Sequence, residues 1–274
     1  MLPEAWDDAL QEKIMTLVCE QPRSKHPQTL AFNWRAPVGE KRYFLKVFHQ
    51  AAMNGAVKDL FRPSKAWRFW RQGLALSAAG FNVPLTVGAG ECRQLGFFQR
   101  AFVLTAKVDG QSLPAYLASL AKDRETVRSM KLKRNRLARL AQIVRQLHHR
   151  GFLHGDLVAS NLFVAVDGEG EPTFYFMDND RTHYFPTWVP QSLWKRNLIQ
   201  LNRMPLPTIT LQDRVRFLCA YLGGRRLSAA DRRFARWIET QTRRRRHECD
   251  GADPTMDFRK LMRWNSDVGV NRDG

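Results

Sequence analysis

Two polar side chains, Asp156 and Asn161, lie five positions apart in the segment HGDLVASNLF, residues 154–163. This segment follows a stretch typical of a helix and leads into the apolar run NLFVAV, which is typical of a strand. A carboxylate can accept the proton of a hydroxyl group, and an amide oxygen is a hard ligand of the kind that Mg²⁺ prefers. Taken alone, Asp and Asn beside a strand are more often residues of an ordinary turn.

Two further candidates, Lys46 and Asp178, belong to apolar segments typical of strands. Lys46 interrupts YFLKVF, so its ammonium group either reaches solvent or is held for a ligand. Asp178 follows FYFM, and Asp180 comes two residues later. A strand Lys, a helix, H-x-D-L-x-x-x-N and an Asp after a strand occur in this order in phosphotransferases. In that chemistry Lys46 binds the inner phosphates of a nucleotide, Asp156 accepts the hydroxyl proton, and Asn161 and Asp178 bind Mg²⁺.

The elements that must position these residues fall into two parts. The first hundred residues indicate a strand-rich lobe with one helix. We expect strands over TLAFNW and KRYFLKVFH, a helix over PSKAWRFWRQGLALSAAG with Ser64 as N-cap and Gly80 as its stop, and two strands within FFQRAFVLTAKVDG. The rest is mainly helical, most clearly over KLKRNRLARLAQIVRQLHHRG, where Gly151 is the expected C-cap.

The sequence therefore predicts an α+β fold of two lobes. The small β-rich N-lobe spans residues 1–105 and carries the phosphate-binding Lys46. The larger helical C-lobe spans residues 106–274 and carries the catalytic loop, the metal loop and the C-terminal helices. A hinge is expected near residues 105–110.

The composition is that of a soluble folded protein with an excess of positive charge. Lys and Arg number 44 against 26 Asp and Glu, which gives a net charge of +18, and such a surface attracts polyanions. The four Cys residues lack C-x-x-C spacing, which favours free thiols in a reducing compartment. The segment MLPEAWDDALQEKIM has no apolar core of a signal peptide, and no stretch is apolar enough to span a membrane. We therefore expect a cytoplasmic protein.

The basic residues gather in three regions of the sequence. They either form solvated faces of helices or face an anionic membrane surface; nucleic-acid binding is disfavoured, because no zinc finger, RNP-like motif or recognition helix is present. Trp188, in YFPTWVPQSLW, is a candidate for stacking on a sugar or for the membrane interface. The regions comprise Arg62, Lys65, Arg68 and Arg71; Arg128, Lys131, Lys133, Arg134, Arg136 and Arg139; and Arg243, Arg244, Arg245 and Arg246.

The chain resembles the lipopolysaccharide kinase family, whose members phosphorylate inner-core heptose or Kdo and share the protein-kinase-like fold. The likeness runs from about residue 28 to about residue 240. It covers the strand YFLKVF, the helix SKAWRFWRQGLAL, the hinge FVLTAKVDGQSL, the loops LHHRGFLHGDLVASNLFV and FMDNDRTHY, and the C-terminal segments LWKRNLIQLNRMPL and DRVRFLCAYL. The H-G-D-x4-N and D-x-D-R motifs are specific for kinase-like phosphotransferases, and the C-terminal segments narrow the likeness to this family.

The resemblance implies transfer of the γ-phosphate of ATP, with Mg²⁺, to a sugar hydroxyl of the lipopolysaccharide inner core. The implied acceptor is the lipopolysaccharide core or a lipid A-linked glycolipid, met by a peripheral protein on the cytoplasmic face of the inner membrane. The implied site comprises Lys46 and Asp156 as catalytic residues; Lys46, Gly39, Asn161 and Asp178 for the nucleotide; Asn161 and Asp178 for the metal; Asp180 and Arg181 to order the loop or meet the acceptor; and His154 to brace the catalytic loop.

Three positions depart from the pattern of protein kinases. RAPVGE replaces a G-x-G-x-x-G loop, so the phosphate cover rests on Gly39 and nearby backbone amides. The helix segment SKAWRFWRQG has no acid to pair with Lys46; Phe69 stands where a Glu is expected, and Asp59 is the nearest acid upstream. Gly155 replaces the Arg of H-R-D, and no A-P-E segment follows, which favours a small-molecule or glycolipid acceptor over a protein.

Two alternative functions remain open at this point. The same mechanism could serve another acceptor, such as an aminoglycoside-like small molecule. A chain without the helix Glu could also be a non-catalytic kinase-like module that binds at a membrane, although a module without activity has no need for Asp156, Asn161 and Asp178 together.

Overall fold

A computed structural model describes residues 7–24, 26–36, 39–49, 63–94, 97–122, 127–186, 189–204, 209–224 and 226–250. The chain divides into two compact units. The first holds residues 1–109 and 175–182, and the second holds residues 110–174 and 183–274. The segment 175–182, which contains Asp178, therefore groups with the unit that contains Lys46. The predicted boundary between the two lobes, at residues 105–106, stays a prediction.

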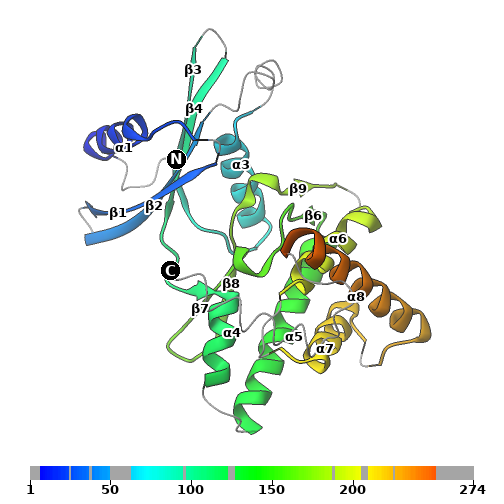
Figure 1. The fold of residues 1–274 in the computed structure, drawn as a ribbon. Coiled ribbons are helices and arrows are strands. Elements are labelled where there is room, and N and C mark those ends of the chain that lie inside the picture. Colours follow the sequence, from blue (N-terminus) through cyan, green and yellow to red (C-terminus); the bar gives the residue numbers. More distant parts are fainter. Residues whose placement is uncertain are drawn as a thin grey trace. The chain divides into compact units, whose positions relative to one another are not determined.

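The first unit is built on an antiparallel sheet of four strands (Figure 1). Its order is β1-β2-β4-β3, and β2 is the longest strand. The register places Lys46 of β2 opposite Thr29 of β1 on one side and Val103 of β4 on the other. The strands are β1 (Gln28–Ala36), β2 (Gly39–His49), β3 (Thr86–Gln94) and β4 (Phe97–Ala106).

Alternation along β2 divides its side chains between two helices, one on each face of the sheet (Figure 1). Helix α1 (Asp8–Glu20) packs Leu10, Ile14 and Val18 against one face, and α3 (Lys65–Ala78) packs Ala66 and Phe69 against the other. From β2, Tyr43, Leu45 and Val47 join the first cluster and Phe48 joins the second. Because side chains alternate between faces along a strand, Lys46 lies on the face of Phe48 and α3.

Two elements of this unit were not predicted from the sequence. The expectation of one helix was wrong, because α1 forms in addition to α3. The segment FFQRAFVLTAKVDG holds one strand, β4, and the partner of β4 is β3, with the sequence TVGAGECRQ. The Gly residues of β3 have low strand propensity, so the sequence does not indicate a strand there. A Cβ at Gly90 would lie 2.6 Å from the Phe102 ring, so the packing of Phe102 favours glycine at this position.

The predicted boundaries of α3 are confirmed. The Trp67 N–H donates to Ser64 Oγ at 3.1 Å, and Gly80, just past the end of the helix, has φ of 80°. Gly151 ends the long helix of the second unit in the same way, with φ of 81°. A Cβ at Gly151 would lie 2.0 Å from the Phe185 carbonyl oxygen, so only glycine fits this turn.

The second unit is mainly helical and carries two short sheets (Figure 1). One sheet has the order β5-β7-β8, and the other pairs β6 with β9. None of the described helices is long and apolar enough to cross a membrane. The elements are α4 (Leu113–Lys122), α5 (Val127–His149), α6 (Gln191–Asn202), α7 (Leu211–Leu222), α8 (Ala229–Asp250), β5 (Gln111–Ser112), β6 (Phe152–Leu153), β7 (Leu162–Val166), β8 (Pro172–Phe176) and β9 (His183–Tyr184).

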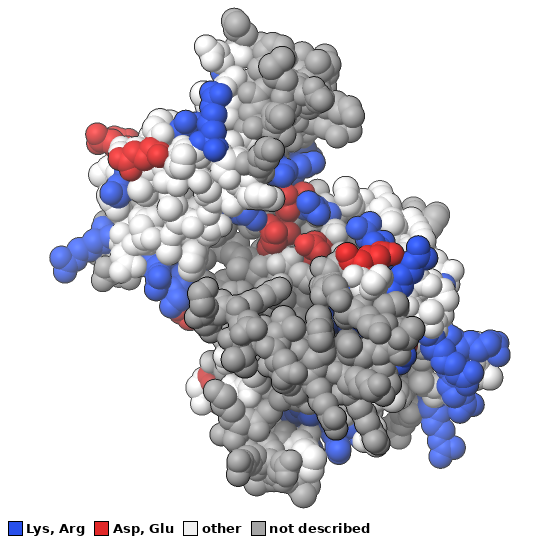
Figure 2. Space-filling model, viewed as in Figure 1, with Lys and Arg blue, Asp and Glu red and all other residues white. Residues whose placement is uncertain are grey.

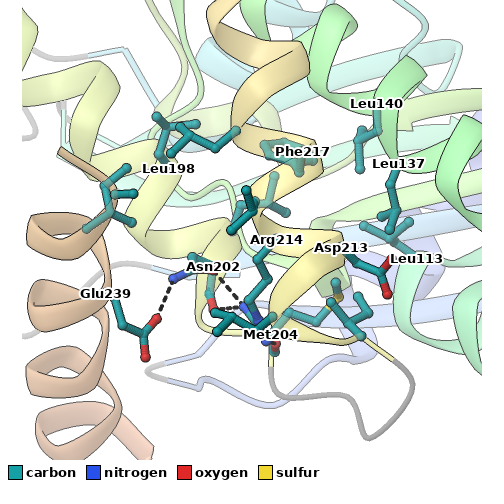
Figure 3. Close-up of a pocket in the computed structure, with 17 residues that line it drawn as sticks. Leu113, Leu137, Leu140, Leu198, Asn202, Met204, Asp213, Arg214, Phe217 and Glu239 are labelled. Atoms are coloured by element: carbon teal, nitrogen blue, oxygen red, sulfur yellow. Dashed lines mark hydrogen bonds between the residues drawn. The ribbon is translucent and has the colours of Figure 1, made fainter. Parts of the chain in front are cut away.

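Two arginines from different helices hold the C-terminal end of α6. Arg214 of α7 and Arg246 of α8 each donate to the Asn202 carbonyl oxygen at 2.6 Å, and Arg214 also donates to the Met204 carbonyl. Figure 3 shows Arg214 beside Asn202 at one side of an apolar pocket lined by leucines of α5 and α6. A positive group at this end of a helix satisfies its last carbonyls and the helix dipole.

Some of the basic residues are therefore buried and stabilise the fold. This corrects the interpretation of the three basic regions as exposed surfaces alone. Arg246 is only 1% exposed, although Arg244 and Arg245 beside it are exposed. Arg136 is also buried, and it donates to Glu171 Oε2 at 2.7 Å. Within the run Arg243–Arg246 the fourth side chain turns inward because α8 presents every third or fourth residue to the same face.

We expect Arg246→Met to lower the free energy of unfolding by about 3 kcal/mol, because buried hydrogen bonds from a charged group to carbonyls are lost. Arg244→Met is the matched control, since its exposed ion pair with Glu248 contributes less than about 0.5 kcal/mol. Urea-induced unfolding of both variants measures the difference. Equal effects would show that Arg246 does not hold α6.

Candidate active site

The two candidate residues of the first unit, Lys46 and Asp178, form an ion pair. Lys46 Nζ lies 2.5 Å from Asp178 Oδ1, although 132 positions separate the two residues. The ammonium also lies 5.6 Å from the centre of the Phe48 ring, on the same face of β2. The pair is partly open to water, with 23% and 37% of the side chains exposed, so a ligand that enters can reach both groups.

The loop that carries Asp178 is fixed by contacts to the segment that follows α3. The Phe176 N–H donates to the Asn82 carbonyl oxygen at 2.9 Å, and the Phe176 ring meets Phe81 edge to face. Asn179, which is fully buried, donates from Nδ2 to the Phe176 carbonyl oxygen at 3.1 Å. These contacts fix the end of β8, and the following turn η3 (Asn179–Arg181) packs against α3.

Asp178 has a left-handed backbone, with φ of 56° and ψ of 55°. Among the described residues no other non-glycine residue has a positive φ. A side chain in this region is uncommon and persists where the surrounding structure imposes it, which happens most often at functional sites. The backbone geometry therefore singles out the same aspartate that the sequence motif does.

The structure shows what occupies the position where a helix Glu is expected to pair with Lys46. Phe69, at the position where a Glu is expected, is buried in the apolar cluster with Phe48 and Phe98. Among the described residues, Lys46 forms its ion pair with Asp178. Asp59, the other acid considered from the sequence, lies outside the described residues.

Asp180 places a second carboxylate close to Asp178. Burial raises the pKa of Asp180, and the charge of Asp178 raises it further, while Lys46, Arg181 and Lys65 act in the opposite direction. Two neighbouring carboxylates disfavour each other's charged form, and a cation relieves that repulsion. Arg181 is exposed.

In the second unit, Asp156 and Asn161 lie in one compact loop between β6 and β7. Asn161 ends the turn η2 (Ala159–Asn161), and its Nδ2 donates to the Asp156 carbonyl oxygen at 3.0 Å. This bond leaves the Asn161 side-chain oxygen as the group that can bind a cation. The Asp156 N–H donates to Nδ1 of His154 at 3.3 Å, and His154 is only 1% exposed.

Two side chains of α6, which sequence reasoning missed, contact this loop. Gln200 donates from Nε2 to Asp156 Oδ1 at 3.2 Å, and its Oε1 accepts from the Leu157 N–H at 3.3 Å. Asn197 donates from Nδ2 to the His154 carbonyl oxygen at 2.6 Å. Both residues lie in NLIQLN, about forty positions after the loop, and no motif in the sequence marks them.

His148 lies behind Asn197 and is buried. Its Nε2 is 3.1 Å from Asn197 Oδ1, and its Nδ1 is 2.8 Å from the Tyr221 hydroxyl. Burial lowers the pKa of His148 to about 4, although the hydrogen bond with Asn197 acts in the opposite direction. The imidazole is therefore neutral at physiological pH.

Two other predicted positions lie beside or within segments outside the described residues. Gly39 is the first residue of β2 and pairs with Ala36, but residues 37–38 of that hairpin are outside the described part of the chain. Trp188 is also outside it.

No group of three or more His, Cys, Asp or Glu side chains among the described residues could hold a metal ion.

Comparison with known proteins assigns the family. Residues 28–221 match the Lipopolysaccharide kinase (Kdo/WaaP) family, which is more than half of the chain. The chain belongs to this family. No curated protein matches the full sequence closely enough to be counted as a relative.

A solved structure supports the fold of this lipopolysaccharide kinase family member. The structure "WaaP in complex with acyl carrier protein" superposes with a TM-score of 0.62 at 18% identity, and the match covers 85% of this chain and 92% of that one. The PknI kinase domain of Mycobacterium tuberculosis matches with a TM-score of 0.38 at 14% identity, covering 90% of this chain and 92% of that one. The predicted α+β fold of the protein-kinase type, with a small β-rich lobe and a larger helical lobe, is confirmed.

We expect His148 to make the stability of the protein fall at acidic pH. The unfolded chain binds a proton near pH 6.5 and the native imidazole only near pH 4, so stability is lost as pH falls through this window, by about 3 kcal/mol in total. His148→Gln should lose this part of the pH dependence. Urea unfolding at several pH values measures it, with the exposed His183→Gln as control. An unchanged pH dependence in His148→Gln would contradict the assignment.

Proposed function

We propose that the protein is an ATP-dependent kinase that transfers the γ-phosphate to a heptose or Kdo hydroxyl of the lipopolysaccharide inner core. The observation that carries the proposal is the ion pair between Lys46 and Asp178, at 2.5 Å, in a chain of the lipopolysaccharide kinase family. The pair brings the phosphate-binding cation and the metal-binding carboxylate of the motif into contact. The hydrogen-bonded loop with Asp156 and Asn161 supplies the other two groups.

In this proposal Lys46 and Asp178 of the first unit and Asp156 and Asn161 of the second supply the groups that phosphoryl transfer needs. Lys46 binds the inner phosphates, with backbone amides near Gly39 as the phosphate cover. The Asp178 carboxylate and the Asn161 amide oxygen are hard ligands, which fits Mg²⁺. When bound, Mg²⁺ neutralises the charge that develops on the phosphates during transfer.

Asp156 acts as the general base. It accepts the proton of the acceptor hydroxyl and orients that hydroxyl toward the phosphorus atom. His154 holds the loop through its buried ring and the Asn197 contact to its carbonyl. Asp180 and Arg181 order the loop that carries Asp178 or contact the acceptor.

Two alternative functions differ from this proposal, one in its acceptor and the other in having no catalysis. A small-molecule phosphotransferase of the aminoglycoside type would use the same four residues, so only the acceptor separates it from the proposal. A non-catalytic module was suggested by the missing helix Glu, but Lys46 has a carboxylate partner in Asp178. Family membership favours the lipopolysaccharide acceptor.

We also propose that the protein binds the cytoplasmic face of the inner membrane through exposed basic residues. Figure 2 shows a dense group of Lys and Arg side chains at the lower right of this face, where Figure 1 places the start of α8. Arg232, Arg233 and Arg236 of that helix are exposed, and Trp237 beside them is 41% exposed. Cations near an anionic lipid surface each contribute about 1 kcal/mol, and Trp favours the interface.

The first test uses Mg-ATP carrying a labelled γ-phosphate and defined acceptors: Kdo-terminated glycolipid, heptose-containing core glycolipid and an aminoglycoside. We expect label on a lipopolysaccharide acceptor, and a loss of about a thousandfold in Asp156→Asn, because the base is removed. ATP binding by calorimetry should be nearly unchanged, since the phosphate and metal groups remain. Asp8→Asn, exposed on α1, is the matched control. Transfer at the native rate by Asp156→Asn would disprove the role of this residue.

The second test measures binding to vesicles of phosphatidylglycerol and phosphatidylethanolamine by sedimentation. We expect binding at low salt and release at about 1 M NaCl, where charges are screened within a few ångströms. Replacing Arg232, Arg233 and Arg236 by Ser should weaken binding on the order of a hundredfold. The control removes the same charge from exposed Lys13, Arg35 and Lys41 of the first unit. Retention at high salt would point to apolar insertion, and equal losses would contradict a specific surface on α8.

A further inference from the structure

A continuous chain of hydrogen bonds connects the buried His148 to the carboxylate of Asp156. His148 Nε2 is 3.1 Å from Asn197 Oδ1, Asn197 Nδ2 is 3.0 Å from Gln200 Oε1, and Gln200 Nε2 is 3.2 Å from Asp156 Oδ1. All of these residues belong to the second unit. His148 and Asn197 are buried, at 6% and 1% exposure, so the first link is shielded from water.

The direction of these hydrogen bonds follows from the groups that can act only as donors or only as acceptors. Asn197 Nδ2 donates to the His154 carbonyl and to Gln200, which leaves Asn197 Oδ1 to accept from Nε2–H of His148. The neutral imidazole then accepts at Nδ1 from the Tyr221 hydroxyl. Each donor in the series Tyr221, His148, Asn197 and Gln200 therefore points toward Asp156, and no amide can flip without breaking a neighbouring bond.

Gln200 is held at both of its ends. Its Oε1 accepts from the Leu157 N–H and from Asn197, which fixes the amide with its NH₂ group toward Asp156. The backbone around it is also anchored, because Arg214 and Arg246 hold the carbonyl of Asn202 two residues later. A side chain fixed in this way can fix the group that it contacts.

We propose that Gln200 is a positioning residue that sets the orientation of the Asp156 carboxylate for phosphoryl transfer. The terminal torsion of an aspartate is otherwise broad, so a single donor at Oδ1 selects one rotation of the carboxylate. Within the described residues no hydrogen bond reaches Oδ2, which is left to accept the proton of the acceptor hydroxyl. Orientation of a base contributes directly to the rate, because transfer requires a narrow range of geometries. The inference rests on the proposed role of Asp156.

Two substitutions separate orientation of the carboxylate from anchoring of the loop. Gln200→Glu keeps an acceptor for the Leu157 N–H and Asn197 but, at about pH 8 where glutamate is ionised, cannot donate to Asp156. Gln200→Met keeps the length of the side chain and removes both functions. Gln191→Glu makes the same charge change at an exposed position of α6 and is the matched control.

The experiment measures kcat, KM for ATP and the midpoint of thermal unfolding with the lipopolysaccharide acceptor that the wild type uses. We expect kcat to fall about tenfold in both Gln200 variants, because a hydrogen bond to a charged group is lost, with KM for ATP within about twofold. Gln200→Glu should keep a higher unfolding midpoint than Gln200→Met, although its carboxylate repels that of Asp156, and Gln191→Glu should keep both values.

The outcomes separate this inference from the proposed function. A wild-type protein without transfer to any lipopolysaccharide acceptor would overturn both. An active wild type with native kcat in Gln200→Glu would overturn only the inference, because Gln200 would then serve the loop through its acceptor oxygen alone. A loss of kcat in Gln200→Met that comes with a lower midpoint and native kcat in Gln200→Glu would lead to the same conclusion.

Discussion

The ion pair between Lys46 and Asp178 joins two parts of the chain that lie far apart in sequence, and much of the first unit is arranged around it. β2 must present Lys46 on the face of α3, and the turn after β8 must be held beside α3 with Asp178 in a left-handed conformation. The pair is partly exposed, so its contribution to stability is reduced by water. The pair keeps two opposite charges together at a place that is open to water.

In the second unit, the loop that carries Asp156 lies next to buried polar side chains. Polar groups at the end of α5 and along α6 are removed from water, and each must find a partner. The structure satisfies them in one directed series of donors that ends on Asp156. The same series that satisfies buried groups thus determines the position of the candidate base. Burial keeps His148 neutral, which the series requires, since its Nδ1 accepts from Tyr221.

The large positive charge also divides into two roles. Arg214 and Arg246 are buried against backbone carbonyls, and Lys133 pairs with the buried Asp213 at 2.7 Å. These residues hold helices together and are not available to a membrane. Arg232, Arg233 and Arg236 are exposed on the opposite end of α8 from Arg246. A count of basic residues along the sequence therefore overstates the charge that a partner can meet.

The sequence by itself determined the chemical types of the candidate site and the class of fold. Lys46, Asp156, Asn161 and Asp178 could be found because a phosphotransferase needs these groups in this order, and helix α3 could be found because Ser64 and Gly80 mark its ends. Local patterns could not predict β3, in which Gly90 packs against Phe102, or the burial of Arg246. Only the tertiary structure decided that Lys46 pairs with Asp178 and that Asn197 and Gln200 contact the loop of Asp156. These contacts join residues about 40 to 132 positions apart, and no short-range spacing in the chain encodes them.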